Sequence, residues 1–162
     1  MLLIICAEEK EAERLDNFGS RAIIQVTGIG YDSVIRIPRF VCSKNDKVLN
    51  IGYAGSNVYK PGDVLSVKSC KLFDSSKQLK TRELTPLYFN EACCYTADDF
   101  IQFSEDKIEL VDMELYYLSL IYPKIQSIKI VSDNLNYQQY KSSDFAQSWD
   151  KVNQVVWSLI NE

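Results

Sequence analysis

Two short segments of the chain place carboxylates directly after apolar, strand-like runs. VDME (111–114) follows the run IEL, and IVSDN (130–134) continues the run SIKI. Two carboxylates delivered by two strand ends suit substrate binding and proton transfer, which points to an enzyme that acts on a sugar. The same spacing fits two helix N-caps equally well, because Asp also favours that position.

The chain contains no histidine, which excludes Ser-His-Asp and Cys-His catalysis and argues against a zinc site. Acid–base chemistry must therefore use Asp, Glu, Lys, Tyr or Cys. The cysteines lack metal-ligand spacing and are odd in number: Cys6, Cys42, Cys70, Cys93 and Cys94. We expect no metal, no cofactor and a reduced, cytoplasmic protein.

Length and composition predict one globular domain over residues 1–162. The chain has 46% hydrophobic and 25% charged residues, as soluble domains do. A net charge of −4 without a basic cluster argues against nucleic-acid binding. No run is long enough to span a membrane, and the opening MLLIIC is too short for a signal peptide and resembles a first strand.

Short β-branched runs alternate with segments of helical spacing. Strands are expected at 2–6, 22–26, 48–51, 64–67, 92–95, 108–111 and 127–131. Helices are expected at 8–16, 112–122 and 143–161, while 31–43 is ambiguous because of Pro38, and 70–90 resembles a loop. The alternation predicts an α/β sheet covered on both faces.

The last predicted helix carries one apolar stripe, which indicates packing on the core. The stripe is formed by Phe145, Trp149, Val152, Val155, Val156 and Leu159. Ser142, Ser143 and Asp144 offer its N-cap.

Glycines and acids follow most of the predicted strands. Glu8 and Glu11 come after the first strand, GIG (28–30) after the second and GYAG (52–55) after the third. In open α/β sheets, ligands bind at the carboxyl ends of the strands. We therefore expect a binding site at that edge of the sheet.

Together these segments resemble the nucleoside phosphorylase and nucleosidase superfamily, most closely its methylthioadenosine/S-adenosylhomocysteine nucleosidase branch. The resemblance rests on seven segments in the family's order: AEEKEAE (7–13), TGIG (27–30), LNIGYAGS (49–56), PGDVLSV (61–67), TADDF (96–100), VDME (111–114) and IVSDN (130–134). It implies a three-layer α/β/α sandwich around a central mixed β-sheet, in a minimal version.

The resemblance also implies roles for four residues. Glu11 matches the base that activates water, and Asp133 matches the acid that protonates the purine leaving group. Glu114 matches the carboxylate that holds the ribose hydroxyls, with Met113 beside the sugar. Taken alone, Glu11 fits a solvated acid on a charged helix, Asp133 a cap, and Met113 an ordinary core residue.

Further residues match binding positions of the family. Phe100 and Ile101 match positions that contact the purine, and Lys129 stands where an arginine is usual at a hydrogen-bonding site. The remaining matches, several of which are equally compatible with turns, are Gly30, Ala54, Gly55 and Ser132.

Hydrolysis is favoured over phosphorolysis. Phosphorylases hold phosphate with cations, and Asn50 stands where that branch commonly has an arginine. The resemblance thus implies an N-ribosyl hydrolase for a small purine nucleoside, without a cofactor. The alternatives are a phosphorylase, a hydrolase of futalosine-like compounds, and a catalytically silent nucleoside-binding relative.

The chain is shorter than the family's usual members. The reduced segments lie between Glu11 and Arg21, from Cys70 to Tyr95, and between Phe100 and Glu109. Because the family usually forms dimers in which a partner chain closes the pocket, we expect a homodimer.

Overall fold

The computed structural model describes residues 1–36, 46–73, 80–87, 89–142 and 144–162. The described strands are β1 (Leu2–Cys6), β2 (Ala22–Val26), β3 (Lys47–Gly55), β4 (Val64–Leu72), β5 (Arg82–Glu83), β6 (Glu91–Thr96), β7 (Leu110–Asp112) and β8 (Gln126–Asp133). The helices are α1 (Glu9–Ala12), α2 (Tyr31–Ile35), α3 (Leu115–Ile121), α4 (Tyr137–Lys141) and α5 (Ala146–Asn161), with a 3₁₀ turn at Gly19–Arg21.

The strands form one mixed sheet that closes on itself. Its main order is β2-β1-β3-β7-β6-β4-β5, and β8 pairs with both β3 and β4. The pairing circuit β3–β8–β4–β6–β7 therefore returns to β3, where Gly55 faces Val111 in an antiparallel pair. β1 and β2 extend this ring beside β3 in parallel.

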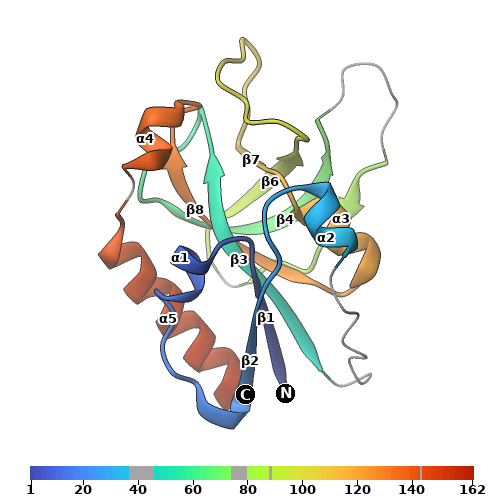
Figure 1. Ribbon diagram of the computed structural model, residues 1–162, viewed down its shortest axis with the longest axis vertical. Helices are drawn as coiled ribbons and strands as arrows, with labels where there is room; N and C mark the ends of the chain where they lie inside the picture. Colours follow the sequence, from blue (N-terminus) through green and yellow to red (C-terminus); the bar gives the residue numbers. More distant parts are fainter. Residues whose placement is uncertain (37–45, 74–79, 88, 143) are drawn as a thin grey trace.

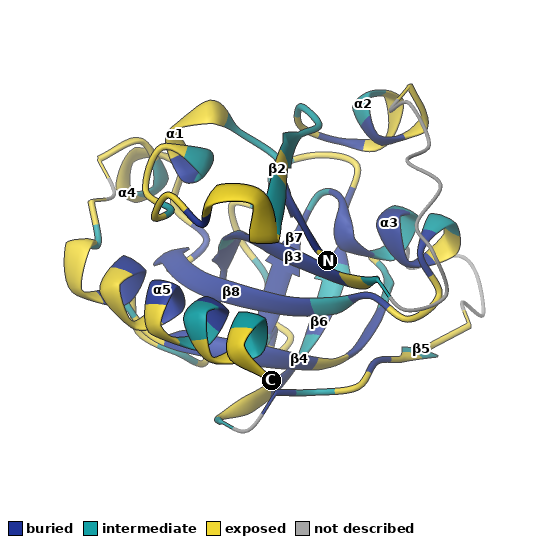
Figure 2. Ribbon diagram, turned by 90° about the horizontal axis from the view of Figure 1, so that it is seen from below, coloured by how far each residue is buried: buried dark blue, intermediate teal, exposed yellow. Residues whose placement is uncertain are grey.

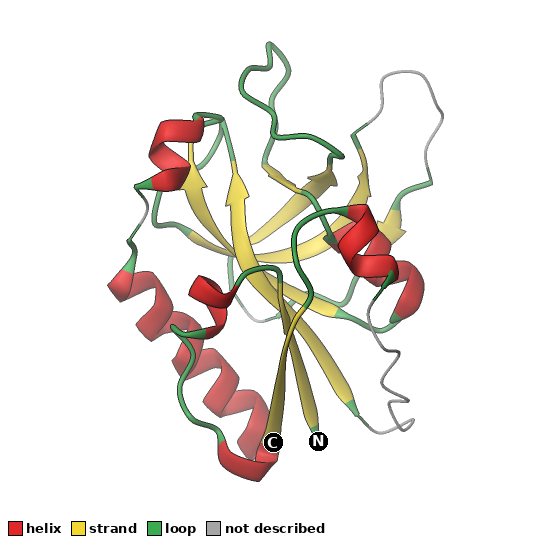
Figure 3. Cartoon of the chain, in the orientation of Figure 1, coloured by secondary structure: helices red, strands yellow, loops and turns green. Residues whose placement is uncertain are grey.

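Alternate residues of the strands face two different cores, as the two-residue period of a strand dictates. In β1, Leu3 and Ile5 belong to the core beneath α2 and α3. Leu2, Ile4 and Cys6 belong to the core beneath α5. Helices therefore cover both faces of the sheet (Figures 1 and 3), which confirms the predicted three-layer α/β/α fold.

The long helix α5 packs one face on the sheet and exposes the other (Figure 2). Trp149, Val152 and Val156 of the predicted stripe are buried in the core, and Phe145, Val155 and Leu159 pack against it. The predicted N-cap is wrong: the helix begins after Phe145, which makes no side-chain capping bond. Ser143 lies outside the described residues.

The predicted strands are all present, although several extend further than the apolar runs suggested. β3 continues through Gly55 and β4 through Leu72, so the segment predicted as loop begins inside a strand and also contains β5. The first helix spans only Glu9–Ala12, and α4 was not predicted. The ambiguous segment 31–43 begins with α2, while Pro38 and Cys42 lie outside the described residues.

No helix in the described ranges is both long and apolar enough to cross a membrane.

Candidate active site

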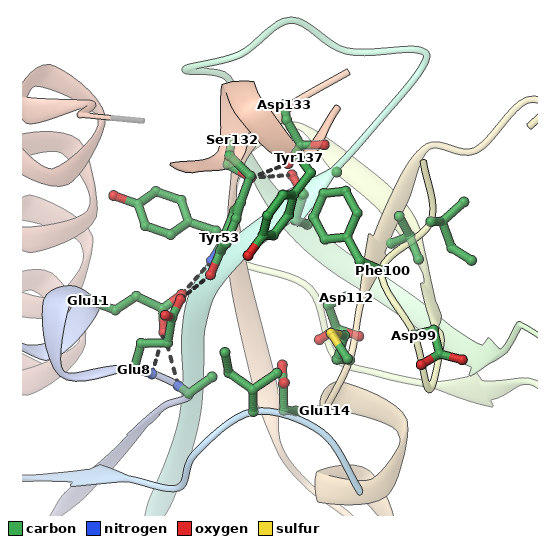
Figure 4. A pocket seen from close by; sticks show the side chains of 18 residues that line it. Glu8, Glu11, Tyr53, Asp99, Phe100, Asp112, Glu114, Ser132, Asp133 and Tyr137 are labelled. Atoms are coloured by element: carbon green, nitrogen blue, oxygen red, sulfur yellow. Dashed lines mark hydrogen bonds between the residues drawn. The ribbon is translucent and has the colours of Figure 1, made fainter. Parts of the chain in front are cut away.

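A cavity of about 270 Å³ opens where the ends of β1, β3, β7 and β8 meet (Figure 4). Segments from α1, the GIG turn, the loop after β6 and α4 complete its wall. Its lining residues are Ala7, Glu8, Glu11, Ile29, Tyr53, Ala54, Gly55, Asp99, Phe100, Ile101, Val111, Asp112, Met113, Glu114, Ser132, Asp133, Tyr137 and Tyr140.

Glu11 points into the cavity rather than into solvent, and its side chain is held by three backbone N–H groups. Ala7 and Glu8 donate to Oε2 at 3.0 Å each, and Tyr53 of β3 donates to Oε1 at 2.8 Å. The residue is 2% exposed, and this burial raises the pKa of Glu11 although the N–H groups lower it. A buried carboxylate with a raised pKa is a stronger base than a solvated one.

Asp133 ends β8 and is 1% exposed. The Ser132 hydroxyl donates to its Oδ2 at 2.6 Å, and the backbone N–H of Asn136 donates to Oδ1 at 3.1 Å. A register shift in the β3–β8 pairing occurs after Ala54, so that Gly55 lies opposite Asp133. Such bulges re-aim side chains next to functional sites.

Glu114 is the N-cap residue of α3 and accepts a hydrogen bond from the backbone N–H of Gly30 at 2.8 Å. Burial, followed by the negative charge of Asp112, raises the pKa of Glu114 from 4.5 to about 8. The GIG turn therefore contributes to the site the backbone N–H that holds Glu114. Gly30 has a φ of +83°, a backbone conformation that favours glycine.

Lys129 lies beneath the cavity and does not line it. Its Nζ forms an ion pair with Oδ2 of Asp112 at 2.7 Å, and both side chains are 1% exposed. Thr96 donates to Oδ1 of Asp112 at 2.6 Å, and the N–H of Leu115 donates to Oδ2 at 3.0 Å. The position predicted to bind substrate is thus occupied by a lysine committed to another side chain.

An aromatic cluster forms one side of the cavity (Figure 4). The ring of Phe100 lies 5.3 Å from that of Tyr137 and 5.7 Å from that of Tyr140. Tyr140 donates to Glu8, and the Nζ of Lys10 lies 4.1 Å from its ring centre. These flat apolar faces are suited to stacking a heteroaromatic base.

The cavity is strongly acidic. Its carboxylates are those of Glu8, Glu11, Asp99, Asp112, Glu114 and Asp133, whereas its lining, within the described ranges, includes no lysine or arginine. Asn50 donates to the carbonyl of Ile5 and accepts from Ser127 beneath the sheet surface. The site thus lacks the cations that usually hold a phosphate.

Nine of the eleven predicted site residues line this one cavity: Glu11, Ala54, Gly55, Phe100, Ile101, Met113, Glu114, Ser132 and Asp133. Gly30 and Lys129 do not. The alternative that Asp112 and Asp133 are helix N-caps is wrong, because the N-cap residues of α3 and α4 are Glu114 and Asn136. Both aspartates nevertheless accept hydrogen bonds from backbone N–H groups just after their strands.

Sequence reasoning missed nine lining residues: Ala7, Glu8, Ile29, Tyr53, Asp99, Val111, Asp112, Tyr137 and Tyr140. Most lie inside or next to the segments that carry the family resemblance, so proximity was a usable signal for them. Tyr137 and Tyr140 belong to α4, and no motif pointed to either.

Metal-binding groups are absent from the part of the chain that the structure describes: no three His, Cys, Asp or Glu side chains are arranged to hold an ion. The arrangement instead offers a base, further carboxylates and an apolar wall around one small space.

Neither a known protein family nor a curated protein sequence matches the chain. Solved structures do match its fold. The MTAN of Chlamydia trachomatis has a TM-score of 0.80 and 20% identity, over 99% of this chain and 96% of that one. A futalosine hydrolase mutant of Helicobacter pylori has a TM-score of 0.79 and 15% identity, over 99% and 98%.

A variant of the Chlamydia protein bound to MTA also matches, with a TM-score of 0.80 and 18% identity, over 99% of this chain and 97% of that one. MTAN denotes 5′-methylthioadenosine/S-adenosylhomocysteine nucleosidase. The predicted nucleoside phosphorylase/nucleosidase-like fold is therefore confirmed.

Proposed function

We propose that this protein is an N-ribosyl hydrolase that cleaves the N-glycosidic bond of a small purine nucleoside of the methylthioadenosine/S-adenosylhomocysteine type. The observation that carries the proposal is the convergence of Glu11, Glu114 and Asp133 on one cavity. These carboxylates come from three distant parts of the chain, and the aromatic wall beside them suits a purine.

In this reaction Glu11 takes a proton from a water molecule, which attacks C1′ of the ribose. The bond between C1′ and the purine nitrogen breaks, its electron pair leaves with the base, and Asp133 protonates a ring nitrogen. Anionic carboxylates around the sugar stabilise the oxocarbenium-like transition state.

The other lining residues bind the substrate. Glu114 accepts hydrogen bonds from the ribose hydroxyls, and Met113 packs against the sugar. Phe100 stacks on the purine, Ile101 contacts it through its backbone, and Ser132 orients Asp133, to which it donates at 2.6 Å. Ala54 and Gly55 leave room for the ligand beside β3.

Hydrolysis is preferred to phosphorolysis because the acidic lining would repel phosphate. A futalosine-type compound is the second candidate substrate, since the H. pylori futalosine hydrolase matches the fold with a TM-score of 0.79, close to the 0.80 of the MTAN.

The test is chromatographic detection of free base from methylthioadenosine, S-adenosylhomocysteine, adenosine, inosine and futalosine, each with and without phosphate. We expect base release that is independent of phosphate. Glu11→Gln and Asp133→Asn should each lower turnover by about 100-fold or more, since general acid–base groups contribute on that scale.

Glu9→Gln is the matched control, because Glu9 is an exposed acid on the same short helix. Full turnover in both catalytic variants would show that the assigned roles are wrong. Thermal stabilisation by a nucleoside without base release would instead identify a silent binding protein.

We also propose that the protein forms a homodimer through α2 and α3. Ile29, Tyr31, Ile35 and Leu120 are large apolar residues on or next to these helices, and each is about half exposed. Ile29 and Tyr31 also line a groove that adjoins the cavity, so a partner there would lie beside the substrate.

A reduced, cytoplasmic location remains a prediction. It is supported by the four described cysteines, which are all free thiols: Cys6, Cys70, Cys93 and Cys94.

A further inference from the structure

Lys129 is the one buried cation among the residues that the structure describes, and it lies among buried acids. It is 1% exposed in the middle of β8. The buried carboxylates are those of Glu11, Asp112, Glu114 and Asp133. Several negative charges in a space of low polarity cannot all persist unless some are neutralised or protonated.

The contacts of Lys129 are with Asp112, not with the cavity. The 2.7 Å ion pair uses Oδ2 of Asp112, which also accepts the N–H of Leu115, while Oδ1 accepts the hydroxyl of Thr96. Asp112 lines the cavity, but its oxygens are engaged inside the protein. Lys129 therefore acts on the cavity through its charge and through the position of Asp112.

Glu114 responds to both members of this pair, and Glu11 responds to Lys129. Asp112 raises the pKa of Glu114, after the larger effect of burial, whereas Lys129 lowers it. Burial raises the pKa of Glu11, and Lys129 lowers it too. The two members of the ion pair therefore act on Glu114 with opposite sign.

Five other titratable groups around these side chains stay neutral near pH 7. Burial raises the pKa of Cys6 on β1, of Cys94 on β6, and of Cys70 on β4 to about 11. Burial also raises the pKa of Tyr53 on β3 and of Tyr140 on α4. Glu8, the N-cap residue of α1, is a further acid, and its negative charge raises the pKa of Glu11.

We infer that Lys129 is a positioning residue that acts through Asp112, and that its buried charge favours the ionised forms of Glu114 and Glu11. The inference rests on the proposed function for its catalytic meaning, since it concerns the protonation of the proposed site. Lys129 itself touches no substrate.

The test compares Asp112→Asn with the double variant Asp112→Asn/Lys129→Met. Asp112→Asn removes a negative charge, so Glu114 should ionise at a pH lower by about one unit. Adding Lys129→Met removes the positive charge, so the pH at which Glu114 ionises should rise again by about one unit or more. The double variant replaces an ion pair by a neutral pair, which buried sites commonly tolerate.

Two readouts follow the shift. The first is the acidic limb of the pH profile of kcat/KM, which reports groups of the free enzyme. The second is the ¹³C NMR titration of glutamate side-chain carboxyls in the free protein, which needs no turnover. Lys129→Arg keeps the positive charge, so we expect it to leave the pKa values of the glutamate carboxyls unchanged.

The inference would be overturned if both readouts, the acidic limb and the carboxyl titrations, gave the same pKa in the two variants to within about 0.3 units. If the ion pair were purely structural, both variants would lose activity, but the pKa of Glu114 would not shift in opposite directions in the two. If the wild-type protein releases no base, the proposed function fails, while the NMR titration still decides the role of Lys129.

Should Asp112→Asn fail to fold, Lys129→Met alone is compared with the double variant. Asp112 then keeps its carboxylate without the cation, while Thr96 and Leu115 still donate to it. The NMR titration of Lys129→Met should show a higher pKa for Glu114, because Lys129 lowers that pKa in the wild type. The double variant should not show this rise, because it lacks both charges. If the pKa of Glu114 does not rise in Lys129→Met either, the inference is overturned.

Discussion

Two glycines of β3 let the proposed catalytic carboxylates lie directly against the strand. A Cβ atom at Gly52 would lie 3.0 Å from Oε1 of Glu11, and one at Gly55 would lie 3.1 Å from Oδ1 of Asp133. Both positions belong to an extended strand, so the requirement is for space rather than for an unusual backbone angle. The motif IGYAG therefore has a spatial reason at each glycine.

Gly52→Ala and Gly55→Ala should each reduce turnover by about 10- to 100-fold, because a small displacement of a reacting group is costly. Their thermal stability should change little. Gly19→Ala provides the contrast: its φ is +60° with nothing within 4 Å of the added Cβ, so it should lose about 1 kcal/mol of stability at unchanged turnover. Calorimetry and initial rates measure the two effects, and equal turnover in all three variants would contradict the packing argument.

Glu114 predicts a pH dependence of stability that does not require activity. Its pKa is about 8 in the folded protein and 4.5 ordinarily, so between these values the folded state keeps a proton that the unfolded state loses. The stabilisation is complete below about pH 4.5 and is lost as the pH rises through 8, by at most about 1.4 kcal/mol per unit.

Glu114→Gln removes this proton linkage, so its unfolding free energy should fall less than that of the wild type between pH 5 and pH 9. Urea unfolding at several pH values measures the slope. The exposed Glu9→Gln should keep the wild-type slope. Parallel curves for wild type and Glu114→Gln would show that Glu114 does not titrate in this range.

For individual residues, the acids of the site could be predicted from the sequence more readily than the side chains that surround them. Glu11, Glu114 and Asp133 stand in segments with a recognisable order, and the structure brings them to one cavity. The Lys129–Asp112 pair could not be foreseen, because the two residues are 17 positions apart on different strands. Only the fold decides that Lys129 points to an acid rather than to a ligand.

At the element scale, strands were predicted well because their β-branched runs are buried. Helices fared less well where they are short. α1 has four residues and α4 has five, which leaves no room for the repeated apolar spacing by which helices are identified. β5 has two residues, and its pairing with β4 depends on the fold rather than on its own composition.

α4 depends on its N-cap and connects that cap to Asp133. The Asn136 side chain accepts hydrogen bonds from the N–H groups of Gln138 and Gln139, while its own N–H donates to Asp133. Asn136→Ala should cost about 1 kcal/mol locally and increase hydrogen exchange in α4, with a loss of turnover because Asp133 becomes less fixed.

Asn136→Asp is the matched control, since it keeps a capping acceptor at the same position. It should retain slow exchange in α4. If Asn136→Ala exchanged as slowly as the wild type, α4 would be held by its side chains and not by its cap. Those side chains include Tyr140, which reaches α1 by donating to Glu8.

At the scale of the whole molecule, the closed circuit of strands gathers residues that are far apart in the chain. β7 pairs with β3 at Gly55, and β8 pairs with β3 along most of its length. Asp112 at the end of β7 and Asp133 at the end of β8 are therefore both brought close to β3. This closure could not be predicted from the sequence, because β7 has three residues and pairs with β3 at one position only, which leaves no signal in the sequence.

Exposed apolar residues on α2 and α3 support the proposed homodimer. Helices α2 and α3 lie next to each other (Figure 1). Ile35 of α2 and Leu120 of α3 are 53% and 54% exposed, and the ring of Tyr31 on α2 lies 4.8 Å from that of Tyr117 on α3. Large exposed apolar groups that lie together mark protein–protein contacts. Because this surface borders the groove beside the cavity, dimerisation and substrate binding should be linked.

Leu120→Glu should therefore shift the protein from dimer to monomer in sedimentation velocity, and it should raise KM if the partner closes the substrate site. Val58→Glu is the matched control, because Val58 is 46% exposed but lies in the loop between β3 and β4. A wild-type protein that sediments as a monomer at all concentrations would contradict the proposed assembly. A monomeric Leu120→Glu with unchanged KM would keep the dimer but remove the partner from the substrate site.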